Sequence, residues 1–393
     1  MSDSSTNKAI SLLLVSHSYP PVIGGSEIEA QRVCEALIKR GHSVKVVCAG
    51  GAPMPDTEDW IDPKGVPVRI YGRYQKGAFK DLVFALQVAA MLVKERRNYQ
   101  LVYFLMQGLH LAVGLPVAHF LQKPILMKIS SSIVIPILNK SMSGRMELGW
   151  LRKWARYVMI LNDGVREQAI EHGFPPQKLV WMPNPVDTDE FCPTDPVERL
   201  RLRAQFGVPP TAPVVLYCGR LAGIKALPSL LDAFRSASVK FPEAVLVLLG
   251  DGPDRAKLVE QAKRLQLREE NVRFMGRVDP AQIPSWAKIS DIFALVSHSE
   301  GFSCALAEAM STGLACVASD IPANRQLIQS GEQGFLTPVG DSEAIATAIV
   351  RLLAEPLLRE RMGQIGRQTI LENYSIDLVA NRYEALIRDA LAP

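Results

Sequence analysis

The sequence predicts an α/β protein made of two doubly wound, Rossmann-like domains that face each other across a cleft, and three observations lead to this fold class. The chain has 393 residues, which is about two to three times the usual size of one domain. Short apolar runs alternate with amphipathic helical patterns from end to end, and a proline-rich stretch interrupts them near the middle. Alternating strands and helices are typical of right-handed βαβ units, which form a parallel sheet covered by helices on both faces.

The N-terminal part begins with a predicted strand, helix and second strand. Residues 10–15 form an apolar run, residues 27–40 an amphipathic helical pattern, and residues 44–48 a second apolar run. Gly41 follows the helix where a C-terminal cap is expected. Further strands are predicted at residues 158–161, 179–182, 214–217, 244–249, 272–275, 292–296 and 315–318. Helical patterns lie between most of these strands, as βαβ units require.

Residues 101–121 contain no Asp, Glu, Lys or Arg and are long enough to span a bilayer as one helix. The segment is interrupted by Gln107, Gly108 and Pro116, and its first residues are β-branched and aromatic. We therefore predict a buried strand, a turn and a buried helix rather than a membrane span.

Residues 192–213 predict the junction between the domains. Prolines at positions 193 and 196 precede a charged helical pattern at 197–206, and three more prolines follow by position 213. Such proline density is typical of linkers. We therefore expect one domain at 1–205 and a second at 206–375, with ligand sites where strand ends meet the cleft.

The composition excludes several classes of protein. Hydrophobic residues make up 48% and charged residues 21% of the chain, which excludes general disorder. The net charge of +4 is too small to indicate a nucleic-acid partner. The six cysteines lie far apart, so a disulfide scaffold and a thiolate zinc site are excluded. With a polar N-terminus and no signal-peptide pattern, a cytoplasmic location is expected.

Two glycine-containing segments follow predicted strands. Gly24 and Gly25 precede a helix, where backbone N–H groups can approach an anion; an ordinary strand-to-helix turn is the alternative. Gly219-Arg220, with Lys225 shortly after, follows the strand that opens the second domain. A diphosphate is expected at such a strand end, with Arg as a forked donor and Lys as a point charge. A solvated loop with two cations is the alternative.

The most specific segment is residues 297–308, which follow an apolar strand. Glu300 lies in the loop, Ser303 is a suitable N-cap for the next helix, and Glu308 lies within that helix, roughly 7.5 Å along its axis. One carboxylate can therefore meet the head of a ligand while the other reaches a group farther back. For two isolated glutamates, local ion pairing and solvent exposure would be the simpler explanation.

Together these segments resemble the retaining GT-B glycosyltransferases of glycosyltransferase family 4, and the resemblance covers nearly the whole chain. The matching motifs occur in the family's order: Gly24-Gly25, Arg40-Gly41-His42, Asn184-Pro185-Val186-Asp187, Gly219-Arg220 with Lys225, Gly250-Asp251-Gly252-Pro253, Gly276-Arg277-Val278, Glu300 with Glu308, and residues 334–341.

The resemblance implies that a nucleotide-diphosphate sugar is the donor, bound mostly by the second domain without a metal or a cofactor. Arg220 and Lys225 match residues that bind the diphosphate leaving group, and Glu300 matches an acid that contacts the sugar hydroxyls. Glu308 matches an acid that binds the ribose hydroxyls. The other implied donor-binding residues are Gly24 and Gly25 at the phosphates, Arg277 and Val278 beside the base, and Gly301, Phe302, Ser303 and Cys304, whose backbone supports sugar and phosphate.

The resemblance also implies that a final helix, at about residues 376–393, crosses back to the first domain. One departure concerns the acceptor side. Many relatives have a histidine after the strand near 125–129, where this chain has Ser130, which can donate a hydrogen bond but cannot replace an imidazole as a base. Lys128 and Ser130 are therefore the candidate acceptor-side residues.

Residues 121–157 contain seven Lys or Arg and a single acid, Glu147. Trp150 and Trp154 lie four residues apart in this basic, amphipathic pattern. One interpretation is peripheral contact of residues 140–157 with the cytoplasmic face of a membrane or with an anionic lipid-linked acceptor. The alternative is a helix whose tryptophans pack inward beneath a solvated basic face.

Two other patterns have simpler explanations. Asp187 and Asp189 imitate a metal-binding motif of another transferase fold, but a turn before a helix is the preferred interpretation. The histidines, including His17 and His110, are scattered singly along the sequence and form no metal-ligand pattern.

The function predicted from the sequence is transfer of a sugar, with retention, from a nucleotide-diphosphate sugar to a glycan, glycolipid or other acceptor, as in polysaccharide biosynthesis. Two alternatives are a nucleotide-sugar epimerase of the same fold and a catalytically inactive glycosyltransferase-like partner subunit. Ser130 keeps the inactive partner open, whereas Lys225, Glu300 and Glu308 argue against the epimerase.

Overall fold

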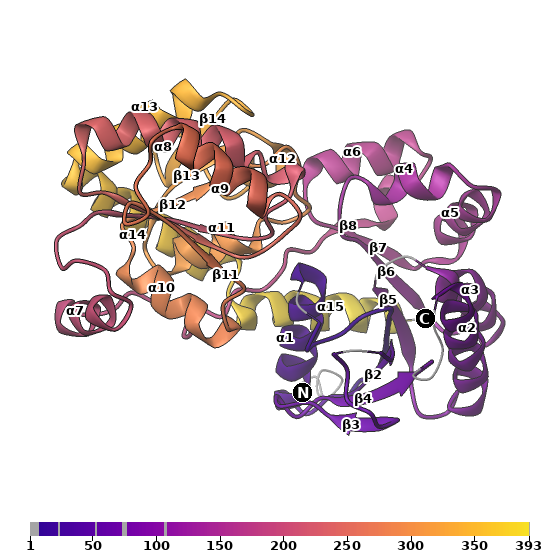
Figure 1. The fold of residues 1–393 in the computed structure, drawn as a ribbon. Coiled ribbons are helices and arrows are strands. Elements are labelled where there is room, and N and C mark those ends of the chain that lie inside the picture. Colours follow the sequence, from indigo (N-terminus) through magenta and orange to yellow (C-terminus); the bar gives the residue numbers. More distant parts are fainter. Residues whose placement is uncertain (1–7, 23, 52, 73–76, 106–107, 393) are drawn as a thin grey trace. The chain divides into compact units, whose positions relative to one another are not determined.

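The computed structural model describes residues 8–22, 24–51, 53–72, 77–105 and 108–392 (Figure 1). The chain divides into two compact units. Unit 1 is Met1–Pro185 with Ile376–Pro393, and unit 2 is Val186–Ser375. Each unit has its own sheet, flanked by helices.

Unit 1 is built on an eight-stranded sheet with the order β3-β4-β2-β1-β5-β6-β7-β8. Its strands are β1 (Ser11–Ser16), β2 (Ser43–Ala49), β3 (Asp59–Ile61), β4 (Pro67–Tyr71), β5 (Leu101–Leu105), β6 (Ile125–Ile129), β7 (Tyr157–Ile160) and β8 (Leu179–Trp181). Only the pairing of β3 with β4 is antiparallel among the described strand pairs. The buried central strands are rich in aliphatic residues, as expected where helices cover both faces of a sheet.

Helices cover both faces of this sheet, and each face has its own apolar core. The helices are α1 (Gly25–Lys39), α2 (Gly77–Lys94), α3 (Leu109–Phe120), α4 (Val134–Asn139), α5 (Met142–Trp154), α6 (Asp163–Glu171), the short η1 (Pro176–Lys178) and α15 (Ile376–Leu391). Leu12 and Leu14 of β1 face the core with α1 and α15, whereas Leu13 and Val15 face the core with α2 and α3. This alternation follows from the two-residue period of a strand.

The C-terminal helix α15 belongs to unit 1 and packs beside α1. Polar contacts hold it there. Arg40 donates to Asp377 Oδ1 at 3.2 Å, and His42 Nε2 lies 3.4 Å from Glu384 Oε1. The Nδ1 atom of His42 accepts a hydrogen bond from the backbone of Ile10 at 3.2 Å. The Arg-Gly-His motif therefore anchors α15 to the start of the sheet.

Unit 2 is built on a parallel six-stranded sheet with the order β11-β10-β9-β12-β13-β14. Its strands are β9 (Val214–Cys218), β10 (Val245–Leu249), β11 (Val272–Gly276), β12 (Ile292–Leu295), β13 (Ala315–Ser319) and β14 (Gly334–Thr337). Its helices are α7 (Pro196–Gln205), η2 (Gly223–Lys225), α8 (Leu227–Lys240), α9 (Arg255–Arg264), η3 (Pro280–Gln282), α10 (Ile283–Ile289), α11 (Cys304–Ser311), α12 (Pro322–Arg325), α13 (Ser342–Ala354) and α14 (Pro356–Asn373). Helix α8 packs against α9 and α13, and α11 packs against α14.

The boundary between the units differs from the one predicted at residues 205 and 206. Residues 186–205 belong to unit 2, because α7 is bound to it by buried contacts. Arg203 is 3% exposed, and it donates to Asp291 Oδ2 at 2.9 Å and to the carbonyl oxygen of Ile289 at 2.8 Å. Arg199 contacts the other oxygen of Asp291 at 2.8 Å. The proline-rich stretch thus belongs to unit 2 and does not lie at the boundary between the units.

The uncharged segment at 101–121 forms β5 and α3, which confirms the predicted strand and helix. The predicted turn includes residues 106 and 107, which lie outside the described residues. Within the described ranges, no helix has both the length and the apolar character needed to cross a membrane.

Helix α5 contains a buried acid that its surroundings do not neutralise. Glu147 is 5% exposed, and its Oε2 atom has no hydrogen-bond partner among the described residues. Burial raises the pKa of this carboxyl from 4.5 to about 7, because the charged form loses its solvation. Between these two pKa values the folded protein binds more protons than the unfolded chain, so stability falls as the pH rises.

We expect Glu147→Gln to remove this pH dependence. The quantity to compare is the melting temperature of the variant minus that of the wild type. This difference should be a few degrees larger at pH 8 than at pH 4.5, because the neutral amide carries no desolvated charge at either pH. Thermal melts at the two pH values measure this difference, and any constant packing cost of the amide cancels. Glu171→Gln, at an exposed position at the end of α6, is the matched control. An equal pH response of wild type and Glu147→Gln would contradict the assignment.

Candidate active site

Both sheets reverse their strand order at one central position. In unit 1 the chain proceeds outward in one direction from β1 and in the other from β5, and in unit 2 the corresponding neighbours are β9 and β12. At such a position the loops after the two central strands diverge and leave a crevice at the carboxyl edge of the sheet. Ligands of open α/β sheets bind at this edge. The residues that follow β1, β5, β9 and β12 are therefore the first to consider.

In unit 2, closely packed glycines fix the loop after β9. A Cβ atom on Gly250 would lie 2.0 Å from the carbonyl oxygen of Gly219, and one on Gly252 would lie 2.2 Å from that of Leu221. The backbone N–H of Leu221 also donates to Asp251 O at 3.0 Å. Only glycine permits this approach of two loops. The loop that carries Arg220 is thus held by the loop after β10, while the Arg220 side chain is exposed.

Lys225 and Glu300 meet at the reversal between β9 and β12. The Lys225 ammonium pairs with Glu300 Oε1, and the side chains are 18% and 13% exposed. The hydroxyl of Ser297 donates to the same oxygen at 2.7 Å, and the N–H of His298 donates to Ile224 O at 2.8 Å. The structure therefore brings together the two loops singled out in the sequence and gives them a shared polar centre.

Glu308, in the second turn of α11, acts electrostatically on the end of β9. Burial raises the pKa of the Cys218 thiol to about 12; the Glu308 carboxylate adds to this shift and the Lys225 ammonium opposes it. Both charges therefore act on the end of β9. A cavity of about 480 Å³ adjoins the loop that carries Lys225, and its lining includes Gly223, Asp254 and His298.

The start of α11 differs in detail from the prediction. Ser303 occupies the N-cap position without a side-chain capping bond; its hydroxyl instead donates to Asn324 Oδ1 at 2.5 Å. The N–H of Cys304 donates to Phe302 O at 3.0 Å, so it is already engaged within the protein. The ring of Phe302 is buried, with its centroid 5.7 Å from that of Tyr374. Support for a ligand from this turn would come from backbone atoms of residues 301–303.

Arg277 and Val278 follow β11, on the far side of β10 from the Lys225 loop. The N–H of Gly250 donates to Gly276 O at 2.8 Å, which joins their loop to the one after β10. Arg277 is exposed and Val278 half-buried. Arg277 and Val278 therefore lie at the same carboxyl edge as Lys225 and Glu300, but in a different loop from those after β9 and β12.

In unit 1, Gly24 and Gly25 begin α1 as predicted, but a carboxylate already lies there. A Cβ atom on Gly24 would be 2.3 Å from Glu27 Oε2, and Glu27 Oε1 accepts a hydrogen bond from Ser18 Oγ at 2.6 Å. Gly24 has an extended backbone, with φ of −170°, so its conformation does not require glycine. The space beside Gly24 is required, because the Glu27 carboxylate fills it. A phosphate at this turn would be repelled unless Glu27 moved.

The acceptor-side prediction for Lys128 needs correction. Lys128 is fully buried, and its ammonium pairs with Glu29 and donates to Asn184 Oδ1 at 2.9 Å. Tyr383 of α15 donates to Glu29 Oε1 at 2.6 Å. Lys128 therefore joins β6, α1 and α15 and presents no atom to an acceptor. Ser130, directly after β6, is partly exposed at the carboxyl edge.

The reversal between β1 and β5 carries a pair of side chains that was not predicted from the sequence. His17, which follows β1, contacts Asp81 of α2 through Nε2 at 3.0 Å, and the side chains are 39% and 47% exposed. The ring centroid of His17 lies 6.4 Å from that of His110, near the start of α3. The position of His17 at the end of the first strand was a usable signal. Asp81 lies 64 residues away, and no sequence pattern connects the two.

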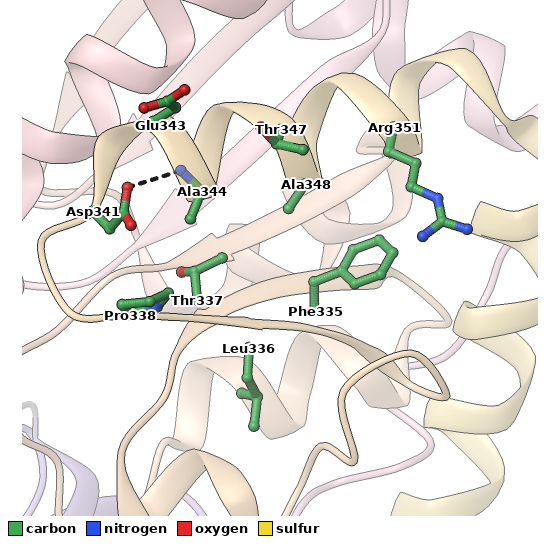
Figure 2. A pocket seen from close by; sticks show the side chains of 10 residues that line it. All are labelled: Phe335, Leu336, Thr337, Pro338, Asp341, Glu343, Ala344, Thr347, Ala348 and Arg351. Atoms are coloured by element: carbon green, nitrogen blue, oxygen red, sulfur yellow. Dashed lines mark hydrogen bonds between the residues drawn. The ribbon is translucent and has the colours of Figure 1, made fainter.

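A different cavity, of about 400 Å³, lies between β14 and α13 (Figure 2). Asp341 caps α13 by accepting from the N–H of Ala344 at 2.9 Å, and the Arg351 guanidinium lies 5.2 Å from the centroid of the Phe335 ring. None of the candidate donor residues lines this cavity. We therefore do not include it in the candidate site.

Asp187 and Asp189 form the turn expected from the sequence. Asp187 Oδ1 accepts from the N–H groups of Asp189 and Glu190 at 3.3 and 3.0 Å. Across the described ranges there is no group of three or more His, Cys, Asp or Glu residues arranged to hold a metal ion.

Comparison with known proteins assigns both units. Residues 198–369 match the family model described as glycosyl transferases group 1, and residues 23–190 match the model described as glycosyltransferase family 4. The chain is a family 4 glycosyltransferase. Its fold is GT-B, as its sequence predicts, and the glycosyltransferase resembles several solved structures along nearly its whole length.

Three of these relatives show the extent of the similarity. The N-acetyl-alpha-D-glucosaminyl L-malate synthase of Bacillus anthracis is 23% identical over 94% of this chain and 95% of its own length. The phosphatidyl-myo-inositol mannosyltransferase of Mycobacterium tuberculosis is 28% identical over 92% of each chain. The crystal structure of Anabaena HepE in complex with UDP and glucose has a TM-score of 0.81 and 21% identity, and covers 97% of this chain and 100% of that one.

Proposed function

We propose that this glycosyltransferase is a retaining, metal-independent enzyme that uses a nucleotide-diphosphate sugar as donor. The observation that carries the proposal is the meeting of Lys225 and Glu300 at the strand reversal of unit 2, in the loop pair that also carries Arg220. A cation and a carboxylate beside a second, exposed cation are suited to a donor with a diphosphate at one end and sugar hydroxyls at the other.

The proposed chemistry follows from the charges. Cleavage of the bond between sugar and diphosphate leaves positive charge on the sugar and adds negative charge to the diphosphate. The Arg220 guanidinium and Lys225 ammonium would stabilise the leaving group, and Glu300 would hold Lys225 in position and accept hydrogen bonds from sugar hydroxyls. Attack on the face from which the diphosphate departs retains the anomeric configuration, so no protein nucleophile is required. Glu308 would bind the ribose, and Arg277 with Val278 would flank the base.

Support for the donor class also comes from the relatives. HepE was crystallised with UDP and glucose, and several relatives are named as mannosyltransferases. Their names indicate different acceptors, L-malate in one case and phosphatidyl-myo-inositol in another. We therefore propose the donor class for this chain and leave its acceptor to a screen that includes both compounds.

We expect Arg220→Ala and Lys225→Ala each to lower turnover by about 10²–10³-fold, the usual effect of removing one group that stabilises developing charge. Lys240→Ala, at an exposed position at the end of α8, is the control and should retain wild-type activity. The assay measures nucleotide release and anomeric configuration with a panel of nucleotide sugars.

The panel separates the alternatives as well. Conversion of one nucleotide sugar into another would identify an epimerase, and binding of nucleotide sugar without turnover would identify an inactive partner. Full activity of Arg220→Ala or Lys225→Ala would disprove the role assigned to that residue.

We propose that the acceptor binds at the strand reversal of unit 1, where His17 is held by Asp81 and Ser130 lies two strands away. The contact with Asp81 engages Nε2 of His17, and Nδ1 has no hydrogen-bond partner in the described part of the chain. Nδ1 is thus available to an acceptor hydroxyl. His17 would take over the positioning role for which relatives use the histidine that Ser130 replaces.

We expect His17→Ala to lower the rate of nucleotide release by about tenfold or more while the dissociation constant for the nucleotide stays unchanged, because donor binding belongs to unit 2. Release can be measured with water or with an acceptor as the attacking group. Asp81→Asn should show a smaller decrease of the same kind, and His172→Ala, at the end of α6, is the control. Wild-type release rates in His17→Ala would contradict this role.

We also propose peripheral contact with an anionic membrane through residues 140–157. Met142 and Met146, in the first turns of α5, are 81% and 47% exposed, and Lys140 and Arg145 beside them are exposed too. Exposed apolar side chains flanked by cations are typical of interfacial helices. Trp150 and Trp154 are partly buried and pack against the core. The tryptophans therefore point inward, and the proposed membrane contact rests on Met142 and Met146.

We expect the double variant Met142→Asp/Met146→Asp to lower co-sedimentation with phosphatidylglycerol vesicles by about fivefold or more, since it replaces apolar contacts with charges that anionic lipids repel. Leu357→Asp, at a position of unit 2 that is 82% exposed, is the control. Unchanged sedimentation of the double variant, or no binding by the wild type, would refute the contact.

A further inference from the structure

Unit 1 has a basic pocket at the edge of its sheet opposite to the candidate active site. The pocket has a volume of about 790 Å³, and its lining includes Lys123, Lys153, Arg156 and Lys178. Strands β6, β7 and β8 begin at Ile125, Tyr157 and Leu179, so three of these cations come just before three neighbouring parallel strands. The pocket therefore lies at the amino edge of the sheet, whereas His17 and Ser130 lie at the carboxyl edge.

The charge of this basic pocket is not neutralised by its own walls. No Asp or Glu is among the residues that line it, and none of the four cations forms an ion pair with any described carboxylate. Asp389 of α15 accepts a hydrogen bond from Tyr157, one of the lining residues. Among the described residues, the four cations of the pocket therefore lack an ion-pair partner, and the Asp389 carboxylate is already engaged by Tyr157.

Two of the ammonium groups are held in place by neutral acceptors. Lys123 Nζ donates to Tyr99 O at 2.8 Å, and Lys178 Nζ donates to the carbonyl oxygens of Arg152 and Lys153 at 3.1 and 3.0 Å. Carbonyl oxygens orient an ammonium group without cancelling its charge. Lys178 and Arg156 line the same pocket. Burial lowers the pKa of Lys178, and repulsion from the Arg156 guanidinium lowers it further. An anion between them would relieve this repulsion.

The aromatic wall of the basic pocket restricts the type of ligand. The ring of His119 stacks on Trp154 with centroids 4.5 Å apart, and Trp150 stacks on Trp154 with centroids 5.3 Å apart. The Trp154 indole already stacks with two rings, which leaves less of its surface for stacking with a sugar or base. The polar groups available to a ligand are the four cations and neighbouring amides such as Gln122 and Gln177.

We propose that the basic pocket binds a phosphate group, separate from the donor site. Arg offers a fork of N–H donors and Lys a point charge, and both suit phosphate oxygens. The volume of the pocket lies in the range of small-molecule sites. The phosphate would belong either to a soluble phosphorylated compound or to the headgroup of an anionic lipid. Both sources present the same group to Lys153 and Arg156, the two exposed cations of the pocket.

Isothermal titration of the full chain with inorganic pyrophosphate tests the proposal. The variant Arg220→Ala/Lys225→Ala removes the cations of the donor site, so any binding that remains belongs elsewhere. We expect this variant to retain one pyrophosphate site per chain. Adding Lys153→Gln and Arg156→Gln should then weaken binding by about tenfold or more, since two charge-assisted contacts are lost. Both side chains are exposed, and the described structure gives neither an ion pair; the Arg156 guanidinium only lies 5.8 Å from the centroid of the Tyr157 ring. The added changes should therefore leave the fold intact.

The matched control carries Lys263→Gln and Arg361→Gln in the same background. Both residues are exposed in unit 2, and together they change the net charge equally. No pyrophosphate binding in the Arg220→Ala/Lys225→Ala variant would overturn the proposal. Equal weakening by the control pair would also overturn it, because the loss would then reflect overall charge and not the pocket.

A second measurement separates the two sources of phosphate. Wild type and Lys153→Gln/Arg156→Gln are sedimented with vesicles of phosphatidylglycerol and with neutral phosphatidylcholine vesicles. If the variant loses both pyrophosphate affinity and sedimentation with the anionic vesicles, the pocket takes a lipid headgroup. If it loses pyrophosphate affinity alone, the pocket takes a soluble phosphate. Either result supports the phosphate site.

Discussion

The ion pair between Lys225 and Glu300 depends on the order in which unit 2 lays down its strands. The two residues are 75 positions apart in the sequence, and they meet because β9 and β12 are neighbours at the point where the sheet changes direction. The same reversal creates the crevice into which their loops project. If the strands of unit 2 followed one another in consecutive order, β9 and β12 would not be neighbours. Lys225 and Glu300 could then not form their ion pair.

A second ion pair, between Lys128 and Glu29, has a structural role. It is fully buried and includes Asn184 and Tyr383 as hydrogen-bond partners. Removing one member of such a pair leaves the other charge uncompensated, which costs about 3–5 kcal/mol. The two Lys-Glu pairs thus differ in burial and in role. The half-buried pair at the carboxyl edge can exchange partners with a ligand, whereas the buried pair connects β6, α1 and α15.

The sequence was sufficient for the fold class, because the alternation of strands and helices and the family motifs are local patterns. The predicted final helix agrees with α15, and the strand-turn-helix interpretation of residues 101–121 was correct for the part that the structure describes. The domain boundary was wrong, because proline density reports chain stiffness and not the long-range contacts of Arg199 and Arg203. The burial of Lys128 and the contact of His17 with Asp81 were also beyond reach, since each depends on partners many residues away.

Helix α15 completes the apolar core on one face of unit 1, where Val379, Tyr383 and Ile387 are all buried. Unit 2 has no such dependence on a distant segment, since it is continuous in sequence. Because α15 follows all of unit 2 in the sequence, the apolar face of unit 1 that it covers stays uncovered during synthesis until unit 2 has been made. Completion of the N-terminal unit thus requires synthesis of the whole C-terminal unit.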